Sequence, residues 1–289
     1  MSLTLRALRA SAHTVGSIAK PKITPAALAA VVMAALAAPT QAAIFTMTDQ
    51  NSVVQVNTTT QAGVFSWTVG GVSQVNQEWY WYRIGSSGAE SSIDTLSAPV
   101  VSQPTSATLT ATYANAQLSV RVDYLLRGGT AGSGISDLAD TITLTNLTAS
   151  SMSLHFFAYT DYDLQATPNN DTAQLGKSGI TNKFNELYQT DLLGTITDSV
   201  NTPGADHGEV ALGGTTLAKL TDANPTTLSD TAGPVGPGNV AGALEWDLTL
   251  GSGQAMVLSR DQNLTGVVPE PASLGLLALG TLGLLRRRR

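Results

Sequence analysis

Cysteine is absent from the 289-residue chain, which excludes a disulfide framework, a thiolate metal site and a cysteine nucleophile. Histidine is scarce, and residues 43–268 contain two, His155 and His207. Neither belongs to a G-x-S-x-G elbow, an H-E-x-x-H helix or a phosphate-binding loop. We therefore expect a protein that is not an enzyme, and we interpret His207 as a loop residue.

Basic side chains are scarce in the same region. Residues 43–268 contain 20 acidic and 7 basic residues, which gives this part a net charge of −13. Nucleic-acid phosphates bind Lys and Arg, so the balance argues against a nucleic-acid partner. It also argues against direct adsorption to anionic lipid, while an acidic surface favours solubility outside the cell.

The chain also lacks an apolar run of the roughly 20 residues that a membrane-spanning helix needs. At the N-terminus, a basic segment without acids, residues 1–22, precedes the apolar residues 26–38 (AALAAVVMAALAA). Small residues then offer a cleavage position after Ala42 or Ala43. This order predicts a signal helix within a signal peptide, residues 1–42, that signal peptidase removes during export. The alternative is an N-terminal membrane anchor, for which the apolar part is short.

What is abundant from residue 43 onward is Thr, Ser, Val and Gly, with apolar residues recurring at period two, which is typical of strands. In residues 117–126 and 243–250 the alternation places one face in a core and the other in water. Further strands are predicted at residues 44–48, 53–57, 64–69, 78–84, 107–113, 141–146, 152–160 and 255–259.

These short strands predict an all-β fold over residues 43–266, a single exported domain built as an antiparallel β-sandwich that is jelly-roll-like. A single curled sheet or a barrel is the alternative. The offsets of the apolar residues in 182–193 (NKFNELYQTDLL) predict a short helix. Residues 221–242, rich in Pro, Gly, Asn and Thr, are expected to form a long surface loop.

Three aspartates form a candidate calcium site. In an extended strand over residues 155–163 (HFFAYTDYD), Asp161 and Asp163 share a side with His155, and Asp171 follows after a turn. Calcium accepts carboxylates in flexible geometry, so Asp161, Asp163 and Asp171 could supply its ligands. The alternative is that these aspartates cap a turn at the end of the strand, since the glycine and distal glutamate of an EF-hand are missing. Apart from calcium, we expect no cofactor.

Four consecutive aromatic residues, Trp79, Tyr80, Trp81 and Tyr82, form a candidate glycan site. On a strand the two tryptophans point one way and the two tyrosines the other, so one pair must leave the core side. Two exposed rings about 7 Å apart could stack on successive sugar units. The alternative is that both faces of this strand are covered.

The C-terminus holds the second apolar run, residues 272–285, which as a short hydrophobic helix would reach about 21 Å, against a hydrocarbon core of about 30 Å. Four arginines, Arg286, Arg287, Arg288 and Arg289, follow it and are expected to stay cytoplasmic. This topology leaves the acidic body outside. A segment this short predicts a precursor that is held transiently in the inner membrane until a membrane enzyme processes it.

The triplet Pro269, Glu270 and Pro271, the Leu/Gly-rich run and the terminal arginines resemble the PEP-CTERM sorting signal, here residues 267–289. This resemblance implies recognition by an exosortase, an integral membrane enzyme of Gram-negative bacteria whose exported products accompany extracellular polysaccharide. Residues 78–85 (EWYWYRIG) and 155–164 (HFFAYTDYDL) are similar to segments of exported PEP-CTERM proteins without an assigned activity.

Together these features predict an exported protein at the cell surface or in the extracellular matrix, with a structural or interaction role. The alternative is a glycan-binding or calcium-dependent adhesive module, with exopolysaccharide as its partner. A secreted hydrolase that uses acidic residues is the third and least favoured class.

Overall fold

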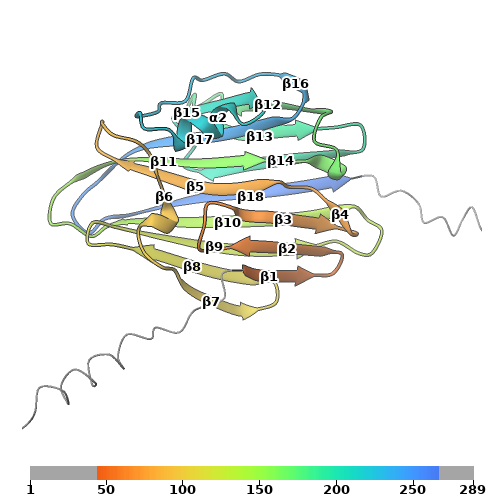
Figure 1. Cartoon of the computed structure of the whole chain (residues 1–289), viewed down its shortest axis with the longest axis horizontal. Helices are drawn as coiled ribbons and strands as arrows, with labels where there is room; N and C mark the ends of the chain where they lie inside the picture. Colours follow the sequence, from red (N-terminus) through yellow and green to blue (C-terminus); the bar gives the residue numbers. More distant parts are fainter. Residues whose placement is uncertain (1–43, 267–289) are drawn as a thin grey trace, which may run out of the picture. The chain divides into compact units, whose positions relative to one another are not determined.

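The computed structural model describes residues 44–266, which form two layers of β-strands (Figure 1). The predicted all-β sandwich is confirmed; each sheet has nine strands, whereas a jelly roll has eight strands in its two sheets together. The predicted signal helix and C-terminal hydrophobic helix lie outside the described residues. Between Ile44 and Gly266, none of the helices has the length and hydrophobicity of a membrane-spanning segment.

The first layer, sheet A, has short strands attached at two places along its main path. Its strand order is β1 (Ile44–Asp49), β2 (Ser52–Asn57), β3 (Gly63–Val69), β5 (Gln77–Ile84), β11 (Met152–Asp161), β17 (Val240–Leu250) and β15 (His207–Leu212), with β4 (Val72–Ser73) on β3 and β6 (Ser91–Ser92) on β5. Its pairs are antiparallel except for a short parallel contact of β3 with β5 at Glu78. Gly63 permits this contact, because a Cβ there would lie 2.0 Å from the Glu78 carbonyl oxygen.

The second layer, sheet B, is antiparallel throughout. Its strand order is β16 (Val235–Gly238), β12 (Asp171–Lys177), β13 (Phe184–Thr190), β14 (Gly194–Thr202), β18 (Ala255–Gly266), β10 (Ile135–Asn146), β9 (Leu118–Gly128), β8 (Thr108–Ala114) and β7 (Val100–Thr105). Three short helices lie in the connections: η1 (Ile93–Thr95), η2 (Leu164–Ala166) and α2 (Thr215–Thr221).

The core lies between the inner faces of the two sheets. In β9 the alternating residues from Leu118 to Leu126 are buried and Arg121 is exposed, as the sequence pattern predicts. At about 25 cal/mol per Å² of apolar surface, such a buried strand face contributes several kcal/mol. Strands β10 and β18 are longer than predicted. Their inward positions include polar residues, such as Asp140 and Arg260, which interrupt the apolar alternation on which the prediction rests.

The predicted helix over residues 182–193 is wrong, because Phe184–Thr190 forms strand β13. The register between β12 and β13 shifts at Gly176/Lys177, where two residues of β13 correspond to one step of β12. This bulge moves the inward positions to Phe184 and Leu187, which are three residues apart. The three-residue spacing of Phe184 and Leu187, which suggests a helix, is therefore caused by a β-bulge.

The predicted loop over residues 221–242 is also only partly correct. It contains β16 and the start of β17, and its remaining part, together with α2, lies against sheet A. We call residues 215–231 the covering segment. It covers the face of sheet A that points away from sheet B, and this is the face that carries the candidate site.

Candidate functional site

Four polar side chains from three adjacent strands meet on the outer face of sheet A. Glu245 and Asp247 lie two residues apart on β17, so both point to the same face. His155 on β11 lies directly opposite Asp247, and His207 on β15 lies directly opposite Glu245. Residues paired in this way share a face of the sheet. We call these four residues the histidine–carboxylate cluster.

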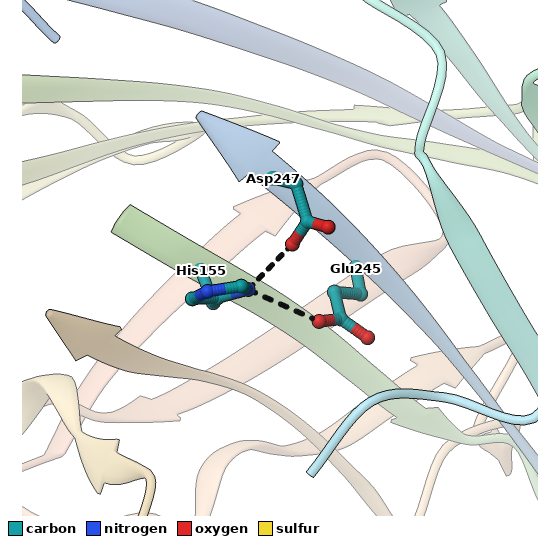
Figure 2. Close-up of side chains that lie close together, drawn as sticks. All are labelled: His155, Glu245 and Asp247. Carbon is teal, nitrogen blue, oxygen red and sulfur yellow. Dashed lines mark hydrogen bonds and ion pairs between the residues drawn. The ribbon is translucent and has the colours of Figure 1, made fainter. Parts of the chain in front are cut away.

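The distances within this cluster are short. The Nδ1 atom of His155 is 2.5 Å from Asp247 Oδ1 and 3.4 Å from Glu245 Oε1 (Figure 2). On the other side of β17, His207 Nε2 is 3.7 Å from Asp247 Oδ2. Ligand atoms of His155, Glu245 and Asp247 all lie within 4.8 Å of one another, and residues 44–266 contain no second group of this kind.

Glu245 is the buried member of the cluster. Its side chain has no exposed surface, and its Oε2 atom accepts a hydrogen bond of 2.8 Å from the Leu228 N–H. Its Oε1 atom has no hydrogen-bond partner and faces His155 (Figure 2). Burial and the nearby Asp247 raise the pKa of Glu245 to about 7, although the Leu228 N–H, His207 and Arg83 lower it. By contrast, the Asp247 side chain is 38% exposed and lies at the solvent edge.

The covering segment is held down by three carboxylates. The N–H groups of Thr226, Leu228 and Ser229 donate hydrogen bonds to Glu90, Glu245 and Glu209, at 2.8, 2.8 and 3.1 Å respectively. Backbone groups of a loop that lies on a sheet need such partners, because no strand supplies them there. The carboxylates of this face thus fix the segment that covers it.

Glu90 and Glu209 also form ion pairs. Arg83 Nε is 2.9 Å from Glu90 Oε1, and both side chains are buried. Lys219 Nζ is 2.6 Å from Glu209 Oε2. Burial alone would raise the pKa of Glu209, but hydrogen bonds from Lys219, Ser229 and Thr216 lower it to about 2.

A pocket of about 600 Å³ adjoins the cluster through Asp247. Its wall also includes Trp246 and the ion pair between Lys183 and Asp206. The N–H of Asp247 donates to Asp206 Oδ2 at 3.1 Å. This hydrogen bond holds Asp206, in the wall of the pocket, against the backbone of a cluster residue.

The hypothesis of glycan stacking on Trp79, Tyr80, Trp81 and Tyr82 is wrong, because these rings are packed on both faces of β5. Trp79, Tyr80 and Trp81 are at most 1% exposed, and Tyr82 is half-buried against the core. Tyr80 stacks on Phe156 with ring centroids 5.8 Å apart. The other face is closed as well, since the Trp79 indole donates to Ser92 Oγ at 2.7 Å.

The predicted calcium ligands Asp161, Asp163 and Asp171 do not come together as a metal-binding group in the described part of the chain. Asp161 Oδ2 accepts a hydrogen bond of 2.9 Å from the side-chain amide of Asn76. Asp171 is fully buried, and its Oδ2 accepts from the Leu164 N–H at 3.3 Å, across the turn. Asp171 therefore caps the turn, which is the alternative to calcium binding that the sequence also allows.

The sequence alone does not predict the histidine–carboxylate cluster. It places Glu245 and Asp247 on the outward face of a strand and His155 on another strand, but no sequence signal shows that these strands are neighbours. His207, predicted to be a loop residue, is the first residue of β15. The predicted cleavage residues Ala42 and Ala43 and the sorting-signal residues 269–271 and 286–289 lie outside the described residues.

The described fold and the terminal pattern define the class as an all-β sandwich protein with a sorting tail. Residues 267–289 match the family model of the PEP-CTERM protein-sorting motif. The chain carries the PEP-CTERM sorting signal, which implies an exported protein that an exosortase processes and that reaches the cell surface or beyond. No protein of curated function matches the chain.

Solved structures share the fold at low sequence identity. A bacterial glucoamylase complexed with acarbose is 12% identical, with a TM-score of 0.51 over 80% of this chain and 32% of the glucoamylase. A proposed aldose 1-epimerase from Escherichia coli K12 is 10% identical, with a TM-score of 0.51 over 77% of this chain and 99% of that protein. The chain thus spans about a third of the glucoamylase, and at this identity both likenesses concern the fold alone.

Proposed function

We propose that the mature protein works at the cell surface or in the extracellular matrix as a structural or interaction component, without catalytic turnover. The main support for this proposal is that the carboxylates on the outer face of sheet A bind the covering segment. Glu90, Glu245 and Glu209 accept hydrogen bonds from the backbone of the covering segment. A carboxylate that acts on a substrate needs access to it, and these three are occupied by the protein's own chain.

The route to that location is the second part of the proposal. The signal peptide starts export, and the apolar run 272–285 holds the precursor in the inner membrane with Arg286 to Arg289 on the cytoplasmic side. Exosortase then removes the tail near the triplet 269–271. Mass spectrometry of the extracellular pool is expected to find chains that end near this triplet, and chains intact through Arg289 in that pool would contradict the route.

Two assays on the same protein test the functional part. The protein is incubated with a panel of mono- and oligosaccharides while product formation is followed, and it is sedimented with the extracellular polysaccharide of the cells that export it. We expect no turnover and retention in the polysaccharide fraction. Turnover that Glu245→Gln abolishes and the matched surface variant Asp123→Asn preserves would replace this proposal by an enzymatic one. Absence of retention would remove exopolysaccharide as the partner.

A sugar ligand in the pocket beside Trp246 is a second candidate function. The volume of about 600 Å³ suits a small ligand, and the Lys183–Asp206 pair offers a donor and an acceptor for hydroxyl groups. Both structures that share the fold carry names of sugar-acting enzymes. Calorimetry with galactose, glucose and maltose tests this candidate: binding that Lys183→Ala weakens and Arg121→Ala leaves unchanged supports it, and no heat with any of the sugars rejects it.

A further inference from the structure

We propose that the histidine–carboxylate cluster, His155, His207, Glu245 and Asp247, binds a single divalent transition-metal ion of the Zn²⁺ type. This inference is independent of the proposed function, because a bound ion is compatible with a structural role or a sugar ligand. It gives a chemical role to the two histidines of the described domain, which the fold itself does not require.

The donor set matches the chemistry of such an ion. Imidazole nitrogen and carboxylate oxygen are ligands of Zn²⁺ and its neighbours, whereas calcium is bound by oxygen atoms. The strand order β11, β17, β15 places the two carboxylates of β17 between His155 on one side and His207 on the other. Residues separated by up to 92 positions in the chain thus lie side by side: the ligand atoms of His155, Glu245 and Asp247 are mutually close, and His207 adjoins them through Asp247.

The spacing is close to what the ion needs. Zn–N and Zn–O bonds of about 2.0–2.1 Å in a tetrahedron place the ligand atoms roughly 3.4 Å apart. His155 Nδ1 and Glu245 Oε1 are 3.4 Å apart, and His207 Nε2 and Asp247 Oδ2 are 3.7 Å apart. His155 Nδ1 and Asp247 Oδ1, at 2.5 Å, must separate by about 1 Å for a tetrahedral site. Rotation of the partly exposed Asp247 side chain allows this change.

Two further observations point to a ligand at this position. Glu245 Oε1 is buried without a hydrogen-bond partner and faces the cluster, as a ligand atom for a cation would. His207 Nδ1 lies 3.1 Å from Asp230 Oδ1, and in the tautomer with its proton on Nδ1 this contact leaves Nε2 as the ligand atom beside Asp247. A carboxylate behind a histidine is the usual outer partner that orients a metal ligand.

The two nearby basic side chains, Arg83 and Lys183, do not occupy the position proposed for the metal ion. Arg83, which lies opposite His155 on β5, is paired with Glu90 and donates to the Thr226 carbonyl oxygen at 2.9 Å. Lys183 is paired with Asp206. The competing arrangement is a protonated His155 between two carboxylates, and the experiment must separate these two cases.

The experiment titrates the full-length protein with Zn²⁺ alone, by calorimetry after treatment with a chelator, and repeats the titration with Co²⁺ while visible absorption is recorded. We expect one ion per chain and a Co²⁺ spectrum of nitrogen and oxygen ligation that Zn²⁺ abolishes. Ca²⁺ in excess is expected not to displace either ion. A protonated His155 with its two carboxylates predicts instead no saturable binding and no spectrum.

Three variants locate the ion. His155→Gln is expected to weaken Zn²⁺ binding more than about 100-fold, because it removes a ligand, and Asp230→Asn roughly 10-fold, because it removes the outer partner of His207. Asp247→Asn changes a partly exposed side chain, so it tests the site in a chain that folds. The matched control Asp123→Asn, which removes a partly exposed carboxylate on β9, is expected to bind as the parent does. Equal binding by Asp247→Asn and the control, or no saturable heat with Zn²⁺, would overturn the proposal.

Discussion

Arg260 and Glu78 meet in the space between the two sheets, where Arg260 Nη1 lies 3.2 Å from Glu78 Oε1 and each side chain is 1% exposed. Arg260 also pairs with Asp140, at 3.6 Å, and with Asp198. One guanidinium therefore faces three buried carboxylates. Burial and the nearby Glu78 raise the pKa of Asp140 well above its usual range, while Arg260 and the hydrogen bond from Tyr80 lower it.

Arg260→Met is expected to lower the free energy of unfolding by about 3–5 kcal/mol, because it leaves buried carboxylates without their cation. Urea denaturation followed by tryptophan fluorescence measures the loss. The control Arg121→Met removes a surface ion pair whose arginine is 54% exposed. We expect it to change stability by no more than about 0.5 kcal/mol. Similar values for the two variants would contradict the role assigned to Arg260.

Trp81→Ala is expected to destabilise the domain by about 3–5 kcal/mol, because it opens a cavity in a packed region. Trp81 is 1% exposed and packs edge-on against Tyr159, with ring centroids 6.1 Å apart. Thermal unfolding measures the effect. A variant that unfolds like the parent and loses polysaccharide retention would restore glycan stacking on this residue.

Asp171→Asn is expected to gain stability relative to the parent as the pH rises from 5 to 8. Burial raises the pKa of Asp171 to about 7, although the hydrogen bonds from Leu164 and Gln189 lower it. The unfolded carboxyl ionises near pH 4, so the parent loses stability between about pH 4 and 7, and the neutral amide does not. Urea denaturation at several pH values measures the difference, and an offset that is constant with pH would contradict the assignment.

Glu209→Gln is expected to loosen the covering segment without unfolding the sandwich. Glu209 binds Thr216 at 2.8 Å in addition to Lys219 and the Ser229 N–H. Loss of the carboxylate should cost about 1–3 kcal/mol of local stability, with the exposed part of Lys219 reducing the effect. Hydrogen exchange resolved along the chain measures it: faster exchange is expected at residues 215–231 and unchanged exchange in β9. Uniform acceleration in both places would show that the segment is not a separate unit.

The pH dependence of the same segment follows from the lowered pKa of Glu209. A folded carboxyl with a pKa near 2 stabilises the folded state above the ordinary carboxyl pKa, and the contribution disappears as the pH falls through that range toward 2. Protection of residues 215–231 is therefore expected to fall between about pH 4 and 2 in the parent and to stay constant in Glu209→Gln.

The strands that the sequence predicts well are those whose inward residues are all apolar. Strand β9 is the clearest, because its burial alternates without interruption from Leu118 to Leu126. Strands β10 and β18 were predicted too short, since Asp140 and Arg260 occupy inward positions as partners of each other. The pattern of one strand cannot show that two polar side chains on neighbouring strands of the same sheet pair with each other.

The functional residues also differ in how well the sequence predicts them. The sorting motif is contiguous, so residues 267–289 were recognised from the sequence and matched by the family model. The histidine–carboxylate cluster depends on β15 pairing with β17, and residues 207 and 245 are joined by no local signal. The aromatic run at 79–82 misled because its exposure depends on packing partners such as Phe156, Tyr159 and Ser92, which no local pattern places against it.

The position of β18 has a mechanical consequence for the protein once it is attached at its C-terminal end. The strand ends at Gly266, next to the sorting motif, and it is a central strand, paired with β10 over Ile135–Thr145 and with β14 over Gly194–Thr202. A pull on the tail therefore loads two hydrogen-bonded ladders along their length at the same time, whereas an edge strand would peel away one bond after another. A force applied at the C-terminal end of β18 thus has to break both ladders together, so the domain resists such a force better than one held through an edge strand.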